Sequence, residues 1–299
     1  MAKSVTEQVH QGTPVDGVDV VGALSPSRAG DFKTCPLMYR YRTIDRLPEP
    51  PSPDAVRGTV VHKVLEDLFD LPAGERTPQR ARGLVEAAWE QVRELEPERV
   101  ALFDTDDVDA WARWLESCRV VLDRYFELED PTRLEPAERE MYVETTLEDG
   151  LVLRGIVDRV DIAPDGSIRV NDYKSARSPG VGFEARALFQ LRFYALVLYR
   201  MHGRVPSVLR LLYLGNAETI SYEPDLDDLH ATERTLLAIR DAIRTAHESG
   251  DWQARRSAVC SWCSFKALCP EFGGTPPPVP DRQPGDTLRG SRRSATDEL

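Results

Sequence analysis

Apolar residues recur at helical spacing through most of the first half of the chain. Apolar side chains three and four positions apart mark one face of a helix. This spacing predicts helices over residues 57–70, 80–94 and 107–126. Upstream, Ser25 followed by Pro26 is typical of a helix N-cap with proline in the first turn, and it begins a short helix toward Cys35. A proline-rich loop from Leu47 to Pro53 follows it.

The pattern changes to a period of two in the middle of the chain. Alternating, β-branched stretches lie at about 138–147, 151–163 and 167–174. Glu148-Asp149-Gly150 and Pro164-Asp165-Gly166 separate these stretches, and both triplets are typical of tight turns. Three short strands joined by tight turns predict an antiparallel meander.

A helix, a strand and a second helix follow the meander. They are expected at about 183–202, 207–214 and 226–248. Since a helical crossover precedes the last strand, that strand can join the sheet beside a meander strand. The fold class is therefore α/β, with a meander, a crossover helix and a further strand as its core.

The two ends of the chain are too polar, or too rich in proline, glycine and arginine, to bury apolar surface. We expect residues 1–20 and 273–299 to be disordered. One domain, residues 21–272, remains between them. It contains a helical part at about 55–127, a sheet at about 138–215 and a cysteine cluster at 260–269.

Composition limits the cellular setting. The chain has 299 residues with 41% hydrophobic content, enough for one sizeable core. It has no apolar run of about 18 residues and no apolar stretch at its N-terminus, which predicts a cytoplasmic protein that is neither inserted in a membrane nor exported. Clustered thiols in a reducing compartment more often bind metal than form disulfides.

The net charge of −12 argues against binding to nucleic acid, but it is a sum over the whole chain and hides local differences. Residues 127–149 are rich in Glu, whereas residues 169–210 hold eight Arg or Lys against two acids. A basic surface can thus exist on an acidic protein, although an acidic total can also serve solubility alone. Candidate phosphate contacts, against the alternative of simply solvated charges, are Arg40, Arg42, Arg57, Arg177 and Arg192.

Two carboxylates occupy apolar faces of neighbouring meander strands. Alternation places Asp158 on the face of Ile156 and Val160, and places Asp172 and Lys174 on the matching face of the next strand. Two buried carboxylates need a compensating cation, which can be a metal ion or the lysine. A hard ion such as Mg²⁺ or Mn²⁺ would serve phosphodiester hydrolysis, with Lys174 orienting the attacking water.

The alternative for this acidic pair is a buried Asp–Lys ion pair without chemistry. The spacing between Asp158 and Asp172, across a tight turn and on matching faces, favours the metal site. Asp161 lies on the opposite face, where we expect it to be solvated.

Two helices carry polar residues one turn apart. His62 and Glu66 share a face with Gly58, and they can supply a metal ligand and the residue that orients it. Gln190 and Tyr194 lie on the helix after the meander, where Gln190 can contact a phosphate or position Lys174 while Tyr194 packs behind it. For each pair the alternative is a purely structural role.

Cysteine spacing predicts a cluster ligand set. Cys260, Cys263 and Cys269 lie together, and Cys35 lies near the start. Four thiolates match a [4Fe–4S] cluster or a Cys₄ zinc site, and the presence of a single C-x-x-C pair favours iron–sulfur over Zn²⁺. Cys118, within an apolar helix, is expected in the core.

Together these motifs resemble the RecB-like branch of the PD-(D/E)XK nucleases, which includes AddAB-type nuclease domains and CRISPR-associated RecB-like exonucleases. The resemblance runs from about Leu24 to Pro270. It rests on SPSRAGDFKTCPLMYRYR, on GTVVH with Glu66, on GIVD ending at Asp158, on DYKS at Asp172 to Ser175, and on Gln190-x-x-x-Tyr194.

The resemblance implies a restriction-endonuclease-like core with a helical insertion and an iron–sulfur staple. His62, Asp158, Asp172 and the Tyr173 carbonyl would bind Mg²⁺ or Mn²⁺, and Lys174 would be catalytic. Cys35, Cys260, Cys263 and Cys269 would hold the cluster.

The function implied is a metal-dependent DNA exonuclease in repair or recombination, with single-stranded ends or segments as its substrate and Arg57, Arg177 and Arg192 as DNA contacts. No G-x-x-x-x-G-K-[ST] motif is present, so unwinding would need a helicase or another repair protein as partner. The alternatives are a CRISPR-adaptation nuclease of the same fold and a non-cleaving iron–sulfur DNA-binding subunit. A binding subunit would not need the full set of Asp158, Asp172 and Lys174.

Overall fold

The computed structural model describes residues 18–19, 22–50, 52–95, 97, 107–178, 184–279 and 287–288. Most of both terminal segments, 1–20 and 273–299, for which the sequence predicts disorder, lies outside this description. Where they are described, β1 (Val18–Asp19) pairs antiparallel with β8 (Thr287–Leu288).

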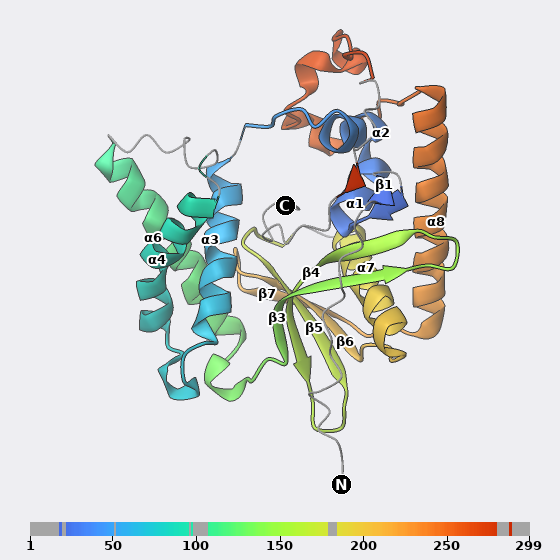
Figure 1. Ribbon diagram of the computed structural model, residues 1–299. Helices are drawn as coiled ribbons and strands as arrows, with labels where there is room; N and C mark the ends of the chain where they lie inside the picture. The colour runs from blue at the N-terminus through green and yellow to red at the C-terminus, as the bar shows by residue number, and fades with distance from the viewer. Residues whose placement is uncertain are drawn as a thin grey trace.

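A six-stranded mixed sheet forms the centre of the protein (Figure 1). Its strands are β2 (Ala23–Leu24), β3 (Glu138–Thr146), β4 (Val152–Ile162), β5 (Ile168–Lys174), β6 (Val208–Tyr213) and β7 (Glu218–Tyr222). Strands β3, β4 and β5 form the expected antiparallel meander, and β6 joins β5 in parallel after the crossover helix. These expectations are confirmed.

Two strands of the six-stranded sheet were not expected from the sequence. Strand β7 adds antiparallel to β6, and the two-residue β2 adds parallel to β4. A two-residue strand is too short for its period to be read. Strand β7 is largely exposed, so it shows no alternation between buried and exposed positions.

The longer helices lie close to their expected positions. They are α3 (Pro53–Leu68), α4 (Pro78–Leu95), α6 (Val108–Leu128), α7 (Glu184–His202) and α8 (Leu226–Ser249). Near the start, α1 (Pro26–Thr34) begins at the Ser25 cap, whose hydroxyl accepts a hydrogen bond from the Arg28 N–H at 3.3 Å. The short α2 (Pro36–Tyr39) follows and continues into a π-helical turn, Arg40–Ile44.

Short 3₁₀ turns complete the chain, at Ala73–Glu75, Pro131–Arg133, Ala258–Ser261, Lys266–Leu268 and Pro270–Phe272. The last three form a small lobe with the cysteines, next to α2 at the top of Figure 1. No helix among the described residues has the length and apolar character needed to cross a bilayer.

Two hydrophobic clusters lie on opposite faces of the sheet. The larger joins the sheet to α1, α7 and α8 and includes Val160 and Val170. The smaller joins α3, α4 and α6 to the other face and includes Tyr173, Leu212 and Leu214. Figure 1 shows these two helical groups on either side of the strands. Alternation along β5 therefore directs Asp172 and Lys174 toward α7, and directs the Tyr173 side chain toward the helices α3 and α6.

Candidate active site

The middle of β4 and the end of β5 bring the three predicted strand residues together. Tyr173 donates its backbone N–H to Asp158 Oδ2 at 2.6 Å, which joins the two strands at the site. Lys174 Nζ lies 2.7 Å from Asp172 Oδ2. Alternation across a tight turn thus correctly predicted that Asp158, Asp172 and Lys174 share one face of the sheet.

Gln190, on α7, closes a ring of polar contacts with the acid and the lysine. Its Oε1 accepts from Lys174 Nζ at 3.0 Å, and its Nε2 donates to Asp172 Oδ1 at 3.0 Å. Asp172 is 2% exposed, and burial raises its pKa to about 6. Burial alone would lower the pKa of Lys174, yet the neighbouring Asp172 and Asp158 raise it above its usual value. The lysine is thus held as an ammonium beside the carboxylates.

Tyr194, on α7, packs against β4 next to Gly155. The side chain is buried, and its ring lies so close to β4 that a Cβ at Gly155 would be 2.9 Å from Tyr194 Cε1. A residue without a side chain at position 155 is therefore needed where α7 crosses the strand.

His62 reaches the site from α3. Its Nε2 lies 3.0 Å from the Tyr173 carbonyl oxygen, and its Nδ1 lies 3.6 Å from Asp158 Oδ2. One turn earlier, a Cβ at Gly58 would be 3.2 Å from Ser175 Oγ, so the glycine lets α3 approach the end of β5 closely.

Glu140, on β3, is a site residue that the sequence analysis missed. Its Oε1 lies 3.9 Å from His62 Nδ1, and its Oε2 is buried without a hydrogen-bond partner. Burial, and then the nearby charge of Asp158, raise the pKa of Glu140 to about 9. His62, Glu140 and Asp158 each offer a ligand atom, and these atoms lie within 4.8 Å of one another. The residue was overlooked in a Glu-rich stretch, although its position in the meander register would have pointed to it.

Glu66 has a different partner from the one expected. It accepts a hydrogen bond from Lys63 Nζ at 2.9 Å, and the same ammonium lies 2.8 Å from Asp67. His62 is instead oriented by the Tyr173 carbonyl. The helical spacing places Glu66 one turn after His62, but the carboxylate of Glu66 binds Lys63, which lies between them in the sequence.

The expectation that Asp161 is solvated was wrong. Its carboxylate accepts hydrogen bonds from Arg159 at 3.2 Å, Arg169 at 3.0 Å and Asn171 at 2.8 Å. The physical reason is the buried Arg159 guanidinium on this face of the sheet, which needs carboxylates around it. The alternation along β4 correctly predicted the face of the sheet on which Asp161 lies. It could not show that α6 and its C-terminal end cover that face.

Most of the candidate phosphate-binding arginines are engaged within the protein. Arg57 pairs with Asp54 at 2.8 Å, and Arg192 donates to the Tyr222 hydroxyl at 2.8 Å. Arg40 pairs with Asp45, and Arg42 pairs with Asp31 and Glu49. Arg177 is exposed, and its charge helps to lower the pKa of Glu218.

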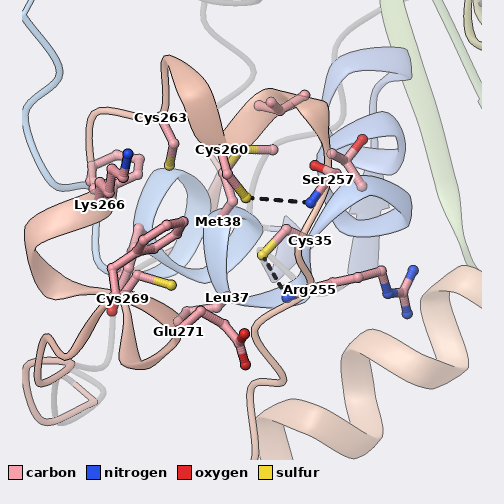
Figure 2. Close-up of a pocket in the computed structure, with 15 residues that line it drawn as sticks. Cys35, Leu37, Met38, Arg255, Ser257, Cys260, Cys263, Lys266, Cys269 and Glu271 are labelled. Atoms are coloured by element: carbon pink, nitrogen blue, oxygen red, sulfur yellow. Dashed lines mark hydrogen bonds between the residues drawn. The ribbon is translucent and has the colours of Figure 1, made fainter.

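The four cysteines expected to bind a cluster line one pocket (Figure 2). Cys35 comes from the α1–α2 junction, and Cys260, Cys263 and Cys269 come from the C-terminal lobe; all four are free thiols. Backbone N–H groups of Arg255 and Ser257 donate to Cys35 Sγ and Cys260 Sγ, each at 3.4 Å. The rest of the lining combines apolar side chains with polar ones. The apolar residues are Leu37, Met38, Tyr41, Val259, Phe265 and Phe272, and the polar ones are Thr34, Arg255, Ser257, Lys266 and Glu271. Grouped sulfur donors suit an iron–sulfur cluster or Zn²⁺.

Cys118 behaves as expected for a core residue. It is fully buried in the cluster formed by α3, α4 and α6. Burial raises the pKa of its thiol to about 12, so the side chain remains a neutral thiol.

A mixed sheet that presents two acids and a lysine beside a histidine defines a nuclease of the acid–acid–lysine type. The chain belongs to the PD-(D/E)XK nuclease superfamily, whose family model matches residues 23–270. Residues 23–270 include the sheet, the flanking helices and all four cysteines of the pocket.

Individual proteins that resemble this chain share little sequence identity with it. The chain is 26% identical over 203 residues to the Gene 69 protein of Mycobacterium phage D29, which covers 60% of this chain and 70% of that protein. A solved structure from Eubacterium rectale, provisionally named an exonuclease, aligns with a TM-score of 0.51 at 12% identity, over 83% of this chain and 90% of that one. The structure of SSO0001 aligns over 84% of this chain and 87% of that chain at 14% identity, with a TM-score of 0.39 that carries no argument. The likeness to the Eubacterium rectale structure agrees with the fold.

Proposed function

We propose that this protein is a divalent-metal-dependent DNA exonuclease of the RecB-like type. The observation that carries the proposal is the convergence of His62 from α3, Asp158 from β4, and Asp172 with Lys174 from β5. Two consecutive strands and a helix that lies 96 residues earlier, counted from His62 to Asp158, contribute to one small polar site. A structural ion pair alone would not require the histidine.

The donor set fits a hard cation such as Mg²⁺ or Mn²⁺. Carboxylates and one imidazole are available, and the buried Glu140 Oε2 has no partner in the described protein. When bound, the ion would lower the pKa of a water molecule and neutralise charge on the phosphate. Lys174 would donate to a phosphate oxygen or orient the attacking water, and Gln190 holds the Lys174 ammonium toward the acids.

The cysteine pocket is proposed to hold a [4Fe–4S] cluster, with structural Zn²⁺ as the alternative. It would join the α1–α2 junction to the C-terminal lobe, closing a loop of more than 200 residues between Cys35 and Cys260. A Tyr41 hydroxyl hydrogen bond to the Leu268 carbonyl at 2.9 Å already links the same two segments. The backbone N–H groups of Arg255 and Ser257 donate to the Cys35 and Cys260 sulfurs and so help to orient these two side chains.

The proposed substrate is DNA, through single-stranded ends or segments, in repair or recombination. Phosphate binding would depend on the metal ion, on Lys174 and on the exposed Arg177. A helicase or another repair protein would supply unwound DNA, since the chain has no nucleotide-binding motif for unwinding.

Degradation of end-labelled single- and double-stranded DNA tests this function. Anaerobically purified protein would be assayed with Mg²⁺ and with Mn²⁺, and wild type would be compared with Asp172→Ala, Lys174→Ala and Arg234→Ala, an exposed cation on α8. Cleavage lost in the first two variants and retained in the third would support the nuclease. Intact DNA under all conditions, with DNA binding retained, would favour the non-cleaving subunit.

A further inference from the structure

The chain that follows Lys174 is held against the turn between β6 and β7. The Leu214 N–H donates to the Lys174 carbonyl at 2.8 Å. Farther along, the Gly215 N–H donates to the Ala176 carbonyl at 3.0 Å, so the parallel pairing of β5 with β6 continues beyond the last residue of β5. A Cβ at Gly215 would lie 2.3 Å from the carbonyl carbon of Ala176, and this close approach of two backbones therefore needs glycine.

Asn216 holds the far end of this segment. Its Oδ1 accepts a hydrogen bond from the Ser178 N–H at 2.9 Å, and its Nδ2 donates to the Ser178 hydroxyl at 2.9 Å. An amide side chain can make both contacts because it offers an acceptor and a donor. The Ser178 hydroxyl also donates to the carboxylate of Glu218. Residues 176–178 are thus attached to the turn at both ends and follow one defined path.

The turn that carries Gly215 and Asn216 is itself supported. Arg124, on α6, donates from Nη1 to the Gly215 carbonyl at 2.6 Å. Ala217, the last residue of the turn, has a φ of +51°, a left-handed conformation that residues with a side chain rarely adopt. Such backbone persists where the surrounding structure requires it, and it concentrates at functional sites. The contacts around Ala217 therefore hold the turn in one conformation.

Arg177 lies in the middle of the segment that the turn holds. The side chain is exposed, and its backbone lies within about 11 Å of Lys174, the span of three extended residues. Hydrogen bonds from Ser178 and Asn216, and then the charge of Arg177, lower the pKa of Glu218, so this carboxylate lies near the guanidinium. Glu218 is also exposed, and an attraction between exposed charges is weak in water. A phosphate group of a bound strand can therefore compete with Glu218 for Arg177.

We propose that Asn216 is a positioning residue of the nuclease, which holds residues 176–178 so that Arg177 contacts a phosphate of the DNA strand that is cleaved at Lys174. The inference rests on the proposed nuclease function and adds the means by which the protein holds the substrate backbone beside the reacting phosphate. A segment that is fixed before binding loses less conformational entropy when its contact with the phosphate forms. Asn216 thus acts on DNA through Arg177 and touches no reacting atom.

DNA binding without cleavage tests this role. The full-length protein would be titrated into a labelled single-stranded oligonucleotide with Ca²⁺ in place of Mg²⁺, at increasing KCl, and binding would be followed by fluorescence anisotropy. The variants are Arg177→Ala, Asn216→Ala and the double variant, and Thr219→Ala, at an exposed polar residue of β7, is the control. If Asn216→Ala folds poorly, Ser178→Ala takes its place, because it keeps the N–H bond to Asn216 and loses the hydroxyl contacts.

The two single variants should lose the same contact. Arg177→Ala should weaken binding and reduce the slope of log K against log salt by about 0.7, as expected for one phosphate contact on a single strand. Asn216→Ala should weaken binding by about threefold or more, but by less than about twofold when Arg177 is already absent. With Mg²⁺, Asn216→Ala should raise KM for DNA and keep kcat within about twofold, because Asp172 and Gln190 hold Lys174.

The control Thr219→Ala should bind DNA as wild type does. An equal loss from Asn216→Ala with and without Arg177, or a lowered kcat at unchanged KM, would overturn the positioning role. Wild-type affinity in Arg177→Ala would also overturn it, and each of these results would leave the nuclease proposal standing. Absence of both DNA binding and cleavage in wild type would overturn the nuclease proposal together with this inference.

Discussion

Arg159 Nη1 donates a hydrogen bond to the Tyr173 hydroxyl at 2.6 Å, on the face of the sheet away from the carboxylates. The backbone of the same Tyr173 donates to Asp158 and accepts from His62. One residue is thus anchored through its side chain on one face, while its peptide groups orient two proposed metal ligands on the other. Arg159 itself is 1% exposed and pairs with Glu129 at the end of α6, so the helical part is tied to the site through this tyrosine.

Removal of the Tyr173 hydroxyl should loosen this anchor without removing any metal ligand. Tyr173→Phe leaves a buried guanidinium short of one acceptor, so we expect a loss of about 1–3 kcal/mol of unfolding free energy, measured by urea denaturation. Cleavage should fall less than in Asp172→Ala. The control is Tyr199→Phe, a partly exposed tyrosine on α7. Equal stability of the two variants would contradict the anchoring role.

The buried pair of Arg159 and Glu129 should be costly to break. The side chain of Glu129 is 5% exposed, and its carboxylate also lies 2.7 Å from Arg210. Glu129→Gln leaves these cations without their shared anion, and we expect a destabilisation of about 3–5 kcal/mol. Glu116→Gln, which breaks an exposed pair with Arg82, should leave stability close to that of wild type. Chemical denaturation of both variants gives the comparison.

Glu140→Gly should make the metal-free protein more stable. Glycine relieves the left-handed backbone at this position, and the change removes a buried carboxylate that faces Asp158, so we expect a gain of about 1–3 kcal/mol. Thermal unfolding with and without Mn²⁺ measures the effect. Wild type should gain stability on adding the ion, and the variant should gain little. Loss of stability in the metal-free variant would argue against strain at this position.

The cysteine pocket makes a separate prediction. Cys260→Ser should lose the broad visible absorbance and the bound iron and sulfide of anaerobically purified protein, because one of four ligands is removed. Unfolding should then occur at lower temperature, since the link between the chain ends is lost. Cys118→Ala is the control, because this thiol is buried away from the pocket. Zinc without visible absorbance in wild type would select the Cys₄ zinc alternative.

Alternation in the meander was enough to find Asp158, Asp172 and Lys174, because strand geometry directs every second side chain to the same face. It did not find Glu140, since that residue matters through its position across from Asp158 and through an unusual φ. Helical spacing placed His62 and Gln190 on the correct helices, but it assigned Glu66 to His62 when Lys63 holds it.

Local patterns therefore determined the elements, the tight turns, the face of each strand and the grouping of the cysteines. These features follow from periods of two and 3.6 residues and from turn chemistry, which act over short stretches of chain. Only the tertiary structure decided which charges pair, as Lys174 does with Asp172 and Arg159 with Glu129 and Asp161. It also decided that ligand atoms of His62, Glu140 and Asp158 lie together. Such pairings depend on distances of a few ångströms between segments far apart in sequence, and burial makes each of them energetically decisive.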